Sequence, residues 1–350
     1  MNVKERRGQR RQAVTIKEVA DLAGVSQMTV SRVLNNSEVV RENTRKKVEE
    51  AIRALNYRPN LLARGLAGGQ ALFIGLVYNN PSNSYISEIL VGALNQCRSM
   101  GHYLVLEDCR SDERHADQRS VVERIAAAGL SGVLVIPPLS EDNALLDGLR
   151  AQDIPAVVIA PPQGRTDFPS VSIDDEAAAE AMMLDLFEQG HTDIAFIRGD
   201  EAQNAARRRY RGYLTALKAK GIPVRQEWIA KGDFNYRSGM SAAMELLSAP
   251  DRPSVIFACN DDMAAGAVAA IQAQGLKVPA DVSVVGFDDS SIASGIWPTL
   301  TTVRQPISQM ASRAVELLAE RVGSDDPSSE VVNATLGIEL VHRQSLQCLN

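Results

Sequence analysis

The chain has 350 residues, of which 45% are hydrophobic, and a formal net charge of −6, which predicts two or three domains with ordinary hydrophobic cores. No apolar run reaches the roughly 18 residues of a membrane-spanning helix, and the charged N-terminal segment leads into no signal-peptide core, so we expect a cytoplasmic protein that spans no membrane. The four cysteines and four histidines are scattered, which argues against a disulfide framework and a zinc site and predicts no bound metal.

Charge is divided unevenly along the chain. Residues 1–69 hold 14 basic and 7 acidic side chains, a net charge of +7, whereas the remaining residues hold 23 basic and 36 acidic ones, a net charge of −13. A basic N-terminal region on an acidic body predicts that only this region binds a polyanion.

The basic region predicts three short helices. The first is expected over 15–24, where Thr15 opens a capping-box pattern before an amphipathic segment. The second is expected over 26–34, with Ser26 as its N-cap, and the third over 44–57, without a clear cap. Three helices of this length can form one small all-α domain.

The spacing of Ala20, Gly24 and Val30 is typical of a helix-turn-helix motif. The small Ala20 lets two helices approach closely, Gly24 permits the sharp turn, and Val30 fixes the second helix against the first. The outer face of the second helix then carries groups that can read DNA, since guanidinium pairs with guanine, an amide pairs with adenine and hydroxyls suit phosphates. This face consists of Gln27, Met28, Thr29, Ser31 and Arg32. The alternative interpretation is a small helical bundle with a solvated surface.

The sequence pattern changes after a short linker at 60–70. Apolar runs typical of strands lie at 72–78, 103–108, 132–138, 156–160, 171–175, 193–199, 228–233, 255–260 and 283–288, and helical stretches lie between them at 89–100, 117–128, 141–150, 176–189, 205–220, 237–248 and 261–274. Alternating strands and helices indicate parallel sheets covered on both faces, here in two similar α/β lobes. Ligands of such sheets bind beyond the carboxyl ends of the strands. Polar residues collect at those ends, at Asn79-Asn80, Asp174-Asp175, Asn260-Asp261-Asp262 and Asp288-Asp289.

Several long motifs resemble the lactose/galactose repressor (LacI/GalR) family. They are "VTIKEVADLAGVSQMTVSRVLNN", "TRKKVEEAIRALNYRPNLLARGLAGG", "GHTDIAFIRG", "NDDMAAGAVAAIQAQGLKVPADVSVVGFDD" and "PTLTTVRQP", and the resemblance runs from Val14 to about Arg343. It implies a dimeric, ligand-controlled repressor with a small all-α helix-turn-helix head. The body is then periplasmic-binding-protein-like, with two doubly wound parallel-sheet lobes around a cleft. Its implied partners are a near-palindromic operator, a second copy of the chain and a small-molecule effector, with no cofactor.

The resemblance also implies domain boundaries. The DNA-binding domain is expected at 14–59, a hinge helix and linker at 60–70, and the effector-binding and dimerisation domain at 71–350. Within the last, we expect the first lobe to comprise about 71–172 and 306–330, and the second about 173–303 and 331–350.

Operator contacts are carried over from the family by position. The reading positions match Gln27, Met28 and Arg32, and Leu66 matches a hinge leucine that enters a central base step from the minor groove. An apolar wedge of this kind kinks DNA, and pairing with the second copy and with DNA can order a linker that is too short to be helical alone. The DNA-binding set is Thr15, Ser26, Gln27, Met28, Thr29, Ser31, Arg32, Asn35, Tyr57, Asn60, Ala63, Leu66 and Ala67.

Effector contacts follow in the same way. Asp174, Arg209, Phe234 and Asp288 match ligand-binding positions of the family, and Tyr85, Asn260 and Gln305 are further candidates. A carboxylate, a guanidinium and an aromatic platform suit a hydroxyl-rich ring, so the expected effector is a sugar or sugar derivative. The alternatives are structural: Asp174 as a helix cap, Arg209 on a solvated face, Phe234 in the core and Asp288 in a turn.

Three other functions compete with a sugar-responsive regulator. Paired acids such as Asp288-Asp289 suggest glycoside chemistry, but no nucleophile elbow, phosphate loop or dinucleotide glycine motif is present, so we expect no catalytic residues. A solute-binding protein would fit the body, but the basic head and the N-terminal segment argue against it. The third alternative is a corepressor-dependent regulator that responds to a non-sugar metabolite.

Overall fold

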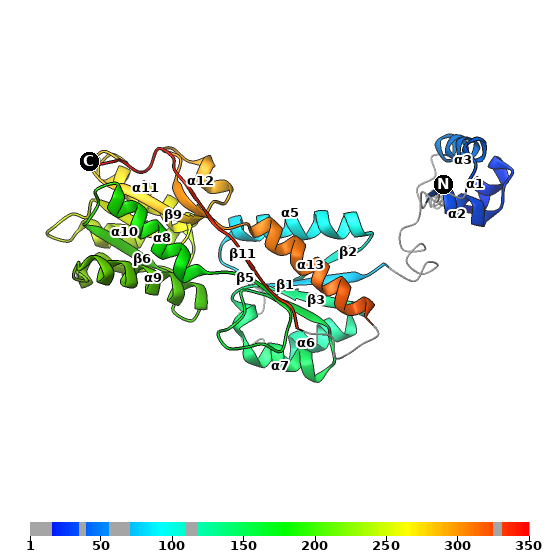
Figure 1. Ribbon diagram of the computed structural model, residues 1–350, viewed down its shortest axis with the longest axis horizontal. Helices are drawn as coiled ribbons and strands as arrows, with labels where there is room; N and C mark the ends of the chain where they lie inside the picture. The colour runs from blue at the N-terminus through cyan, green and yellow to red at the C-terminus, as the bar shows by residue number, and fades with distance from the viewer. Residues whose placement is uncertain (1–15, 35–39, 56–70, 110–117, 325–330, 350) are drawn as a thin grey trace, which may run out of the picture. The chain divides into compact units, whose positions relative to one another are not determined.

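The computed structural model describes residues 16–34, 40–55, 71–109, 118–324 and 331–349. The chain divides into two compact units, Met1–Ala71 and Leu72–Asn350, which are called the head and the body below. Figure 1 shows both units, and each is considered by itself. No helix in the described ranges combines the length and the apolar character that crossing a membrane requires.

The described part of the head consists of three helices around a small core. They are α1 (Ile16–Ala23), α2 (Gln27–Leu34) and α3 (Glu42–Ala54), and their buried side chains are Val19, Ala20, Val30, Val33, Val48 and Ala51. Gly24 has a φ of 64°, in the left-handed region where glycine is favoured, so it makes the turn between α1 and α2. The helix-turn-helix prediction is therefore confirmed, although α3 begins two residues before the expected range and ends three residues before its end, at Ala54 rather than 57.

The described part of the body contains two six-stranded sheets, one in each lobe. The first lobe has the strand order β11 (Asn333–Leu336), β5 (Ser170–Ile173), β4 (Ala156–Ile159), β3 (Gly132–Val135), β1 (Phe73–Tyr78) and β2 (Tyr103–Asp108). The second has β12 (Glu339–Val341), β10 (Thr301–Arg304), β9 (Ser283–Asp288), β8 (Val255–Ala258), β6 (Ile194–Arg198) and β7 (Ile229–Lys231). All pairs are parallel except β10 with β12. The central strands β3, β4, β8 and β9 are buried throughout because helices cover both faces of each sheet.

Helices cover each sheet on two sides (Figure 1). In the first lobe, α5 (Asn83–Met100) packs beside α13 (Ile307–Gly323), and α6 (Gln118–Ala127) packs with α7 (Asn143–Ala151) on the other face. In the second lobe, α8 (Asp175–Glu188) pairs with α9 (Asn204–Lys220), and α10 (Tyr236–Leu247) pairs with α11 (Asp261–Ala273), with the short α12 (Ser291–Gly295) beside α11. Helix α5 begins six residues before its expected start at 89, because the Ser82 hydroxyl accepts a hydrogen bond from the Tyr85 amide and caps the helix.

Three described segments pass between the lobes: β5 leads into α8, β10 leads into α13, and β11 leads into β12. The third passage corrects the expected boundary, which placed all of 331–350 in the second lobe. Asn333–Leu336 pairs in parallel with Ser170–Ile173, so β11 is an edge strand of the first sheet, and the chain enters the second lobe only after Leu336. A short strand at a sheet edge carries little sequence signal about which sheet it joins.

Candidate functional site

The outer face of α2 is the candidate DNA-reading surface. Val30 and Val33 are buried in the head core, whereas Gln27 and Arg32 are exposed and Met28 is 65% exposed. A large apolar side chain this exposed contributes nothing to the core and is available to contact a base. The structure therefore places the three expected reading side chains together on one accessible face.

The hydroxyls near this face have structural partners. The Ser26 Oγ accepts a hydrogen bond from the Thr29 amide at 3.2 Å and lies 2.9 Å from the Thr29 Oγ1, so Ser26 caps α2 as expected. Ser31 is half-buried. The other expected DNA contacts lie outside the described residues and stay predictions: Thr15, Asn35, Tyr57, Asn60, Ala63, Leu66 and Ala67.

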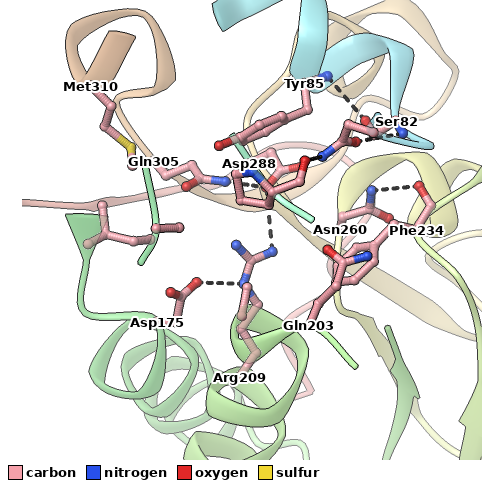
Figure 2. Close-up of a pocket in the computed structure, with 15 residues that line it drawn as sticks. Ser82, Tyr85, Asp175, Gln203, Arg209, Phe234, Asn260, Asp288, Gln305 and Met310 are labelled. Carbon is pink, nitrogen blue, oxygen red and sulfur yellow. Dashed lines mark hydrogen bonds and ion pairs between the residues drawn. The ribbon is translucent and has the colours of Figure 1, made fainter. Parts of the chain in front are cut away.

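A second site lies between the two lobes of the body (Figure 2). Its empty space, counted together with the open solvent at its mouth, is about 500 Å³. It is called the effector cavity below, and its lining consists of Asn80, Ser82, Tyr85, Pro137, Ala160, Ile173, Asp175, Gln203, Ala205, Arg209, Phe234, Asn260, Asp288, Gln305 and Met310. Every expected effector residue except Asp174 is in this set.

Asp174 is the exception, because it caps a helix, as its structural alternative proposed. Its carboxylate accepts the Ala177 amide at 3.1 Å and caps α8, and it forms an ion pair with Arg208 at 2.8 Å. Its side chain is 56% exposed, whereas the next residue, Asp175, is buried and lines the cavity. The helix begins between the two aspartates, so their side chains point in different directions.

Arg209 is the centre of the polar network. It is only 5% exposed, which excludes the solvated-face alternative. Its Nε donates to Asp175 at 2.9 Å, its Nη1 donates to the Cys259 carbonyl at 2.7 Å, and Nη1 lies 3.5 Å from Asp288. The guanidinium also lies over the Phe287 ring, 3.6 Å from its centroid. These contacts fix the orientation of the guanidinium before any ligand arrives.

Asp288 closes the network from the end of β9. The Gln305 side-chain amide donates to its Oδ1 at 2.6 Å. Burial raises the pKa of this carboxyl to about 7, although the nearby Arg209 favours the charged form. Its φ of 123° is a conformation that side chains rarely adopt, and strained residues of this kind cluster at functional sites.

Phe234 and Asn260 form a connected pair. The Asn260 amide donates to the Phe234 carbonyl at 3.0 Å, and its oxygen accepts the Met263 amide at 3.0 Å as the N-cap of α11. Both polar groups of Asn260 are thus occupied, so this residue positions the Phe234 backbone, which has a φ of 66°. Phe234 itself is 7% exposed and faces the cavity.

The expected site residues did not include several polar lining groups. Asn80 and Asp175 belonged only to the general set of polar strand ends, and no signal distinguished Gln203, which precedes α9. Asn80 donates to the Pro137 carbonyl at 2.9 Å and accepts the Ser82 amide at 2.8 Å, so it shapes the loop after β1.

Two polar bridges join the lobes beside the cavity. From the second lobe, the Asp262 carboxylate accepts hydrogen bonds from the hydroxyls of Ser82 and Ser84, at 3.1 Å in the case of Ser84. From the first lobe, both Glu141 oxygens lie 2.7 Å from the Asn204 amide, and Arg207 pairs with Glu141 at 3.3 Å. Only about 40 Å³ of the cavity admits the centre of a water molecule, so the bridged lobes enclose a narrow space.

Comparisons with known proteins give consistent results for both sites. Residues 15–60 match the family described as bacterial regulatory proteins, lacI family, and residues 184–346 match a periplasmic binding protein-like domain. A relative from Bacillus subtilis (strain 168), named probable HTH-type transcriptional repressor ExuR, is 36% identical over 91% of this chain and 95% of its own length. The HTH-type transcriptional repressor PurR of Yersinia pestis (strain Pestoides F) is 37% identical over 95% of this chain and 96% of its own.

Solved structures extend the likeness to the fold. The lac repressor dimer bound to operator and the anti-inducer ONPF has a TM-score of 0.75 and 30% identity, covering 96% of this chain and 100% of that one. A complex of the transcriptional regulator CelR with cellobiose has a TM-score of 0.71 and 32% identity, covering 95% and 99% of the two chains.

Proposed function

The chain belongs to the lacI family of bacterial regulatory proteins, and from this premise we propose how it works: it is a ligand-responsive, sequence-specific DNA-binding repressor of transcription. The observation that carries the proposal is the presence of two sites in one chain, an exposed reading face on α2 and a cavity between two lobes that contains a buried polar network. It is a regulator and not an enzyme, since its relatives are named as transcriptional repressors. The direct test is to select an operator from random DNA and titrate it with the protein.

On DNA, the proposed role of α2 is to read base edges in the major groove. The Arg32 guanidinium can grip a guanine, the Gln27 amide can pair with adenine, and the Met28 side chain can contact a thymine methyl. Leu66 keeps its expected role as a minor-groove wedge. Because the protein must reach operator DNA, we place it in the cytoplasm.

For the effector, we propose a sugar or sugar derivative held in the effector cavity. Phe234 and Tyr85 offer ring faces, and Asp288 and Arg209 offer charged partners for hydroxyls. The relative CelR, which has been solved with cellobiose, supports this class of ligand. No metal or other cofactor enters the proposal.

For assembly, we propose a homodimer on a near-palindromic operator. Val91 and Leu94 on α5 are 53% and 44% exposed, and Leu106 on the edge strand β2 is 49% exposed. Exposed apolar side chains beside β2, an edge strand among the described residues, suit a second copy of the chain. Two heads then match two operator half-sites.

For regulation, we propose that the effector changes the closure of the lobes and thereby repositions the hinge segments at 60–70. A ligand shifts such an equilibrium only by its difference in affinity for the two states. The segments between the lobes, at β5–α8, β10–α13 and β11–β12, are where the backbone must bend.

We expect Arg32→Ala to cost roughly 1–3 kcal/mol of specific operator binding, because a guanidinium–guanine contact is lost. Binding to random DNA should change far less. Fluorescence anisotropy with the selected operator and with a scrambled duplex measures both. The matched control is Arg53→Ala, another exposed arginine of the head, on α3. Equal weakening on the two duplexes would exclude a base-reading role for Arg32.

We also expect operator affinity to fall steeply with salt, because a region of net charge +7 releases counterions when it binds phosphates. A fragment that begins at Ala71 should keep effector binding and lose DNA binding. The measurements are operator titrations across a series of KCl concentrations and calorimetry on the fragment. A fragment that still shifts the operator would overturn the division into head and body.

A further inference from the structure

The charges around the effector cavity carry information about its ligand. Of the described residues that line the cavity, three are charged: Asp175, Arg209 and Asp288. The one cation therefore faces two acids. Two of its three nitrogens are already used, Nε by Asp175 and Nη1 by the Cys259 carbonyl and Asp288. An anionic ligand that approached Arg209 would come close to both carboxylates, and like charges in a buried site repel strongly.

The helix N-termini near the cavity also carry acidic side chains, which repel an anionic ligand. A helix N-terminus ordinarily attracts anions through its free amides and dipole. Here α8 carries Asp175 and Glu176 in its first turn, and α11 carries Asp261 and Asp262. The first amide of α9 is taken by Glu141 of the other lobe. At α5, Asp262 binds the hydroxyls of Ser82 and Ser84. Acidic side chains thus lie at each of these helix N-termini, where they oppose the binding of a phosphate or carboxylate.

Besides the Arg209–Asp288 pair, the cavity offers two neutral groups to a ligand. Among the described residues, the Tyr85 hydroxyl and the Gln203 amide line the cavity without a hydrogen-bond partner in the protein, and both residues are more than nine-tenths buried. In Figure 2 they lie on different sides of the Arg209–Asp288 pair, with Phe234 near Gln203. A neutral ring with several hydroxyls can donate to and accept from these groups while it packs one face against the aromatic ring.

We infer that the effector is an uncharged, hydroxyl-rich ring, and that the cavity discriminates against sugars bearing a carboxylate or a phosphate. This inference rests on the proposed sugar effector and specifies its charge. The residues that discriminate are Asp175 and Asp288, which flank the only charged donor among the described lining residues.

Calorimetry on the full chain at pH 8, where Asp288 is largely ionised, tests the inference with matched series of ligands. Each series contains a neutral sugar, its uronic acid and its 6-phosphate, built on glucose, galactose and mannose, and cellobiose is compared with cellobionate. We expect a neutral member to bind and its charged counterparts to bind at least tenfold more weakly. A uronate or phosphate that binds as tightly as its neutral parent overturns the inference and leaves the sugar effector standing. If no member of any series binds, the sugar effector itself is contradicted, and the inference with it.

A variant separates charge discrimination from shape. Asp175→Asn keeps an oxygen that can accept from Arg209 and removes one negative charge, so uronate binding should improve about tenfold relative to the neutral parent. The matched control is Glu176→Gln, which removes a charge from the same helical turn but outside the cavity lining, where Glu176 pairs with Arg211 at 3.1 Å. An unchanged affinity ratio in Asp175→Asn, or an equal change in the control, would show that this carboxylate does not select against anions.

Discussion

Asp288→Asn and Arg209→Ala are each expected to weaken effector binding by roughly ten- to a hundredfold, since a charged hydrogen bond contributes about 1.5–3 kcal/mol and 1.4 kcal/mol corresponds to a factor of ten. Both side chains are buried in the cavity lining and are oriented by Gln305 and Asp175, so a ligand meets them already in position. The head is unchanged in either variant, and operator binding without effector should persist.

The two variants differ in what they do to the fold. Asp288→Asn keeps an acceptor for Gln305 and Arg209. Arg209→Ala leaves Asp175 and Asp288 buried without their cation, which typically costs about 3–5 kcal/mol of folding free energy. Thermal unfolding of each variant must therefore accompany the titrations. Asp289→Asn is the control: this neighbouring carboxylate pairs with Arg304 and Arg343 at 2.7 Å, outside the effector cavity, and should leave effector affinity unchanged.

The raised pKa of Asp288 gives the same experiment a second readout. With a pKa of about 7, this carboxyl is largely protonated at pH 6 and largely ionised at pH 8. Only the ionised form accepts charged hydrogen bonds from ligand hydroxyls, so effector affinity should fall as the pH is lowered through 7. Arg209 keeps its charge throughout this range. In Asp288→Asn the pH dependence should disappear, and a variant that retained it would assign the titration to another group.

The operator response of these variants also settles the sign of regulation. If the effector is an inducer, Asp288→Asn should stay on its operator at effector concentrations that release the wild type. If it is a corepressor, the variant should fail to reach tight operator binding. A variant that responded at the wild-type effector concentration would show that Asp288 does not contact the ligand.

The sequence predicted those parts of the sites that depend on local pattern. The spacing of Ala20, Gly24 and Val30 defines a turn and a helix contact within a few residues, so the outward face of α2 followed directly. Arg209 and Asp288 were found because their motifs resemble those of the family. The solvated-face alternative for Arg209 is removed only by its burial at 5% exposure, and the structure places Asp288 in the cavity lining.

The remaining errors concern the residue at which a helix begins and contacts between residues far apart in the chain, which a local sequence pattern does not determine. Asp174 and Asp175 are adjacent, and which one caps α8 depends on where the helix begins. The sheet that Asn333–Leu336 joins depends on a pairing with β5, more than 160 residues earlier. Likewise, Asp262 was noted only as a polar strand end, since its partners Ser82 and Ser84 lie on the other lobe, about 180 residues away.

The contact of Asp262 with these serines leads to the second large expected effect. Asp262→Ala should shift the ligand-free body from closed toward open lobes by roughly ten- to a hundredfold, because hydrogen bonds to a charged group contribute about 1.5–3 kcal/mol. Asp262 is nearly buried, and burial raises its pKa while Ser82 and Ser84 favour its charged form, so these hydroxyls compensate for the water it has lost. Full opening is not expected, because Glu141 still bridges to the Asn204 amide.

Distances between spin labels on the two lobes measure this shift. Suitable positions are Glu123 on α6 and Arg237 on α10, which are exposed, with Cys348 replaced by serine because it is the exposed cysteine of the chain. We expect one short distance in the wild type and a second, longer population in Asp262→Ala. Ser84→Ala should produce part of the same change.

A double-mutant cycle then isolates the bridge itself. If Asp262 and Ser84 act through their contact, the double variant should open less than the sum of the two single variants. Ser87→Ala is the control, because the Ser87 hydroxyl lies on the same helix as Ser84 and donates to the Asn83 carbonyl within the first lobe. Effector affinity should fall in step with the closed population, since a ligand that binds closed lobes must then supply the closing free energy. Identical distance distributions in Asp262→Ala and the wild type would mean that the lobes close without this bridge, and that the effector acts on some other contact between them.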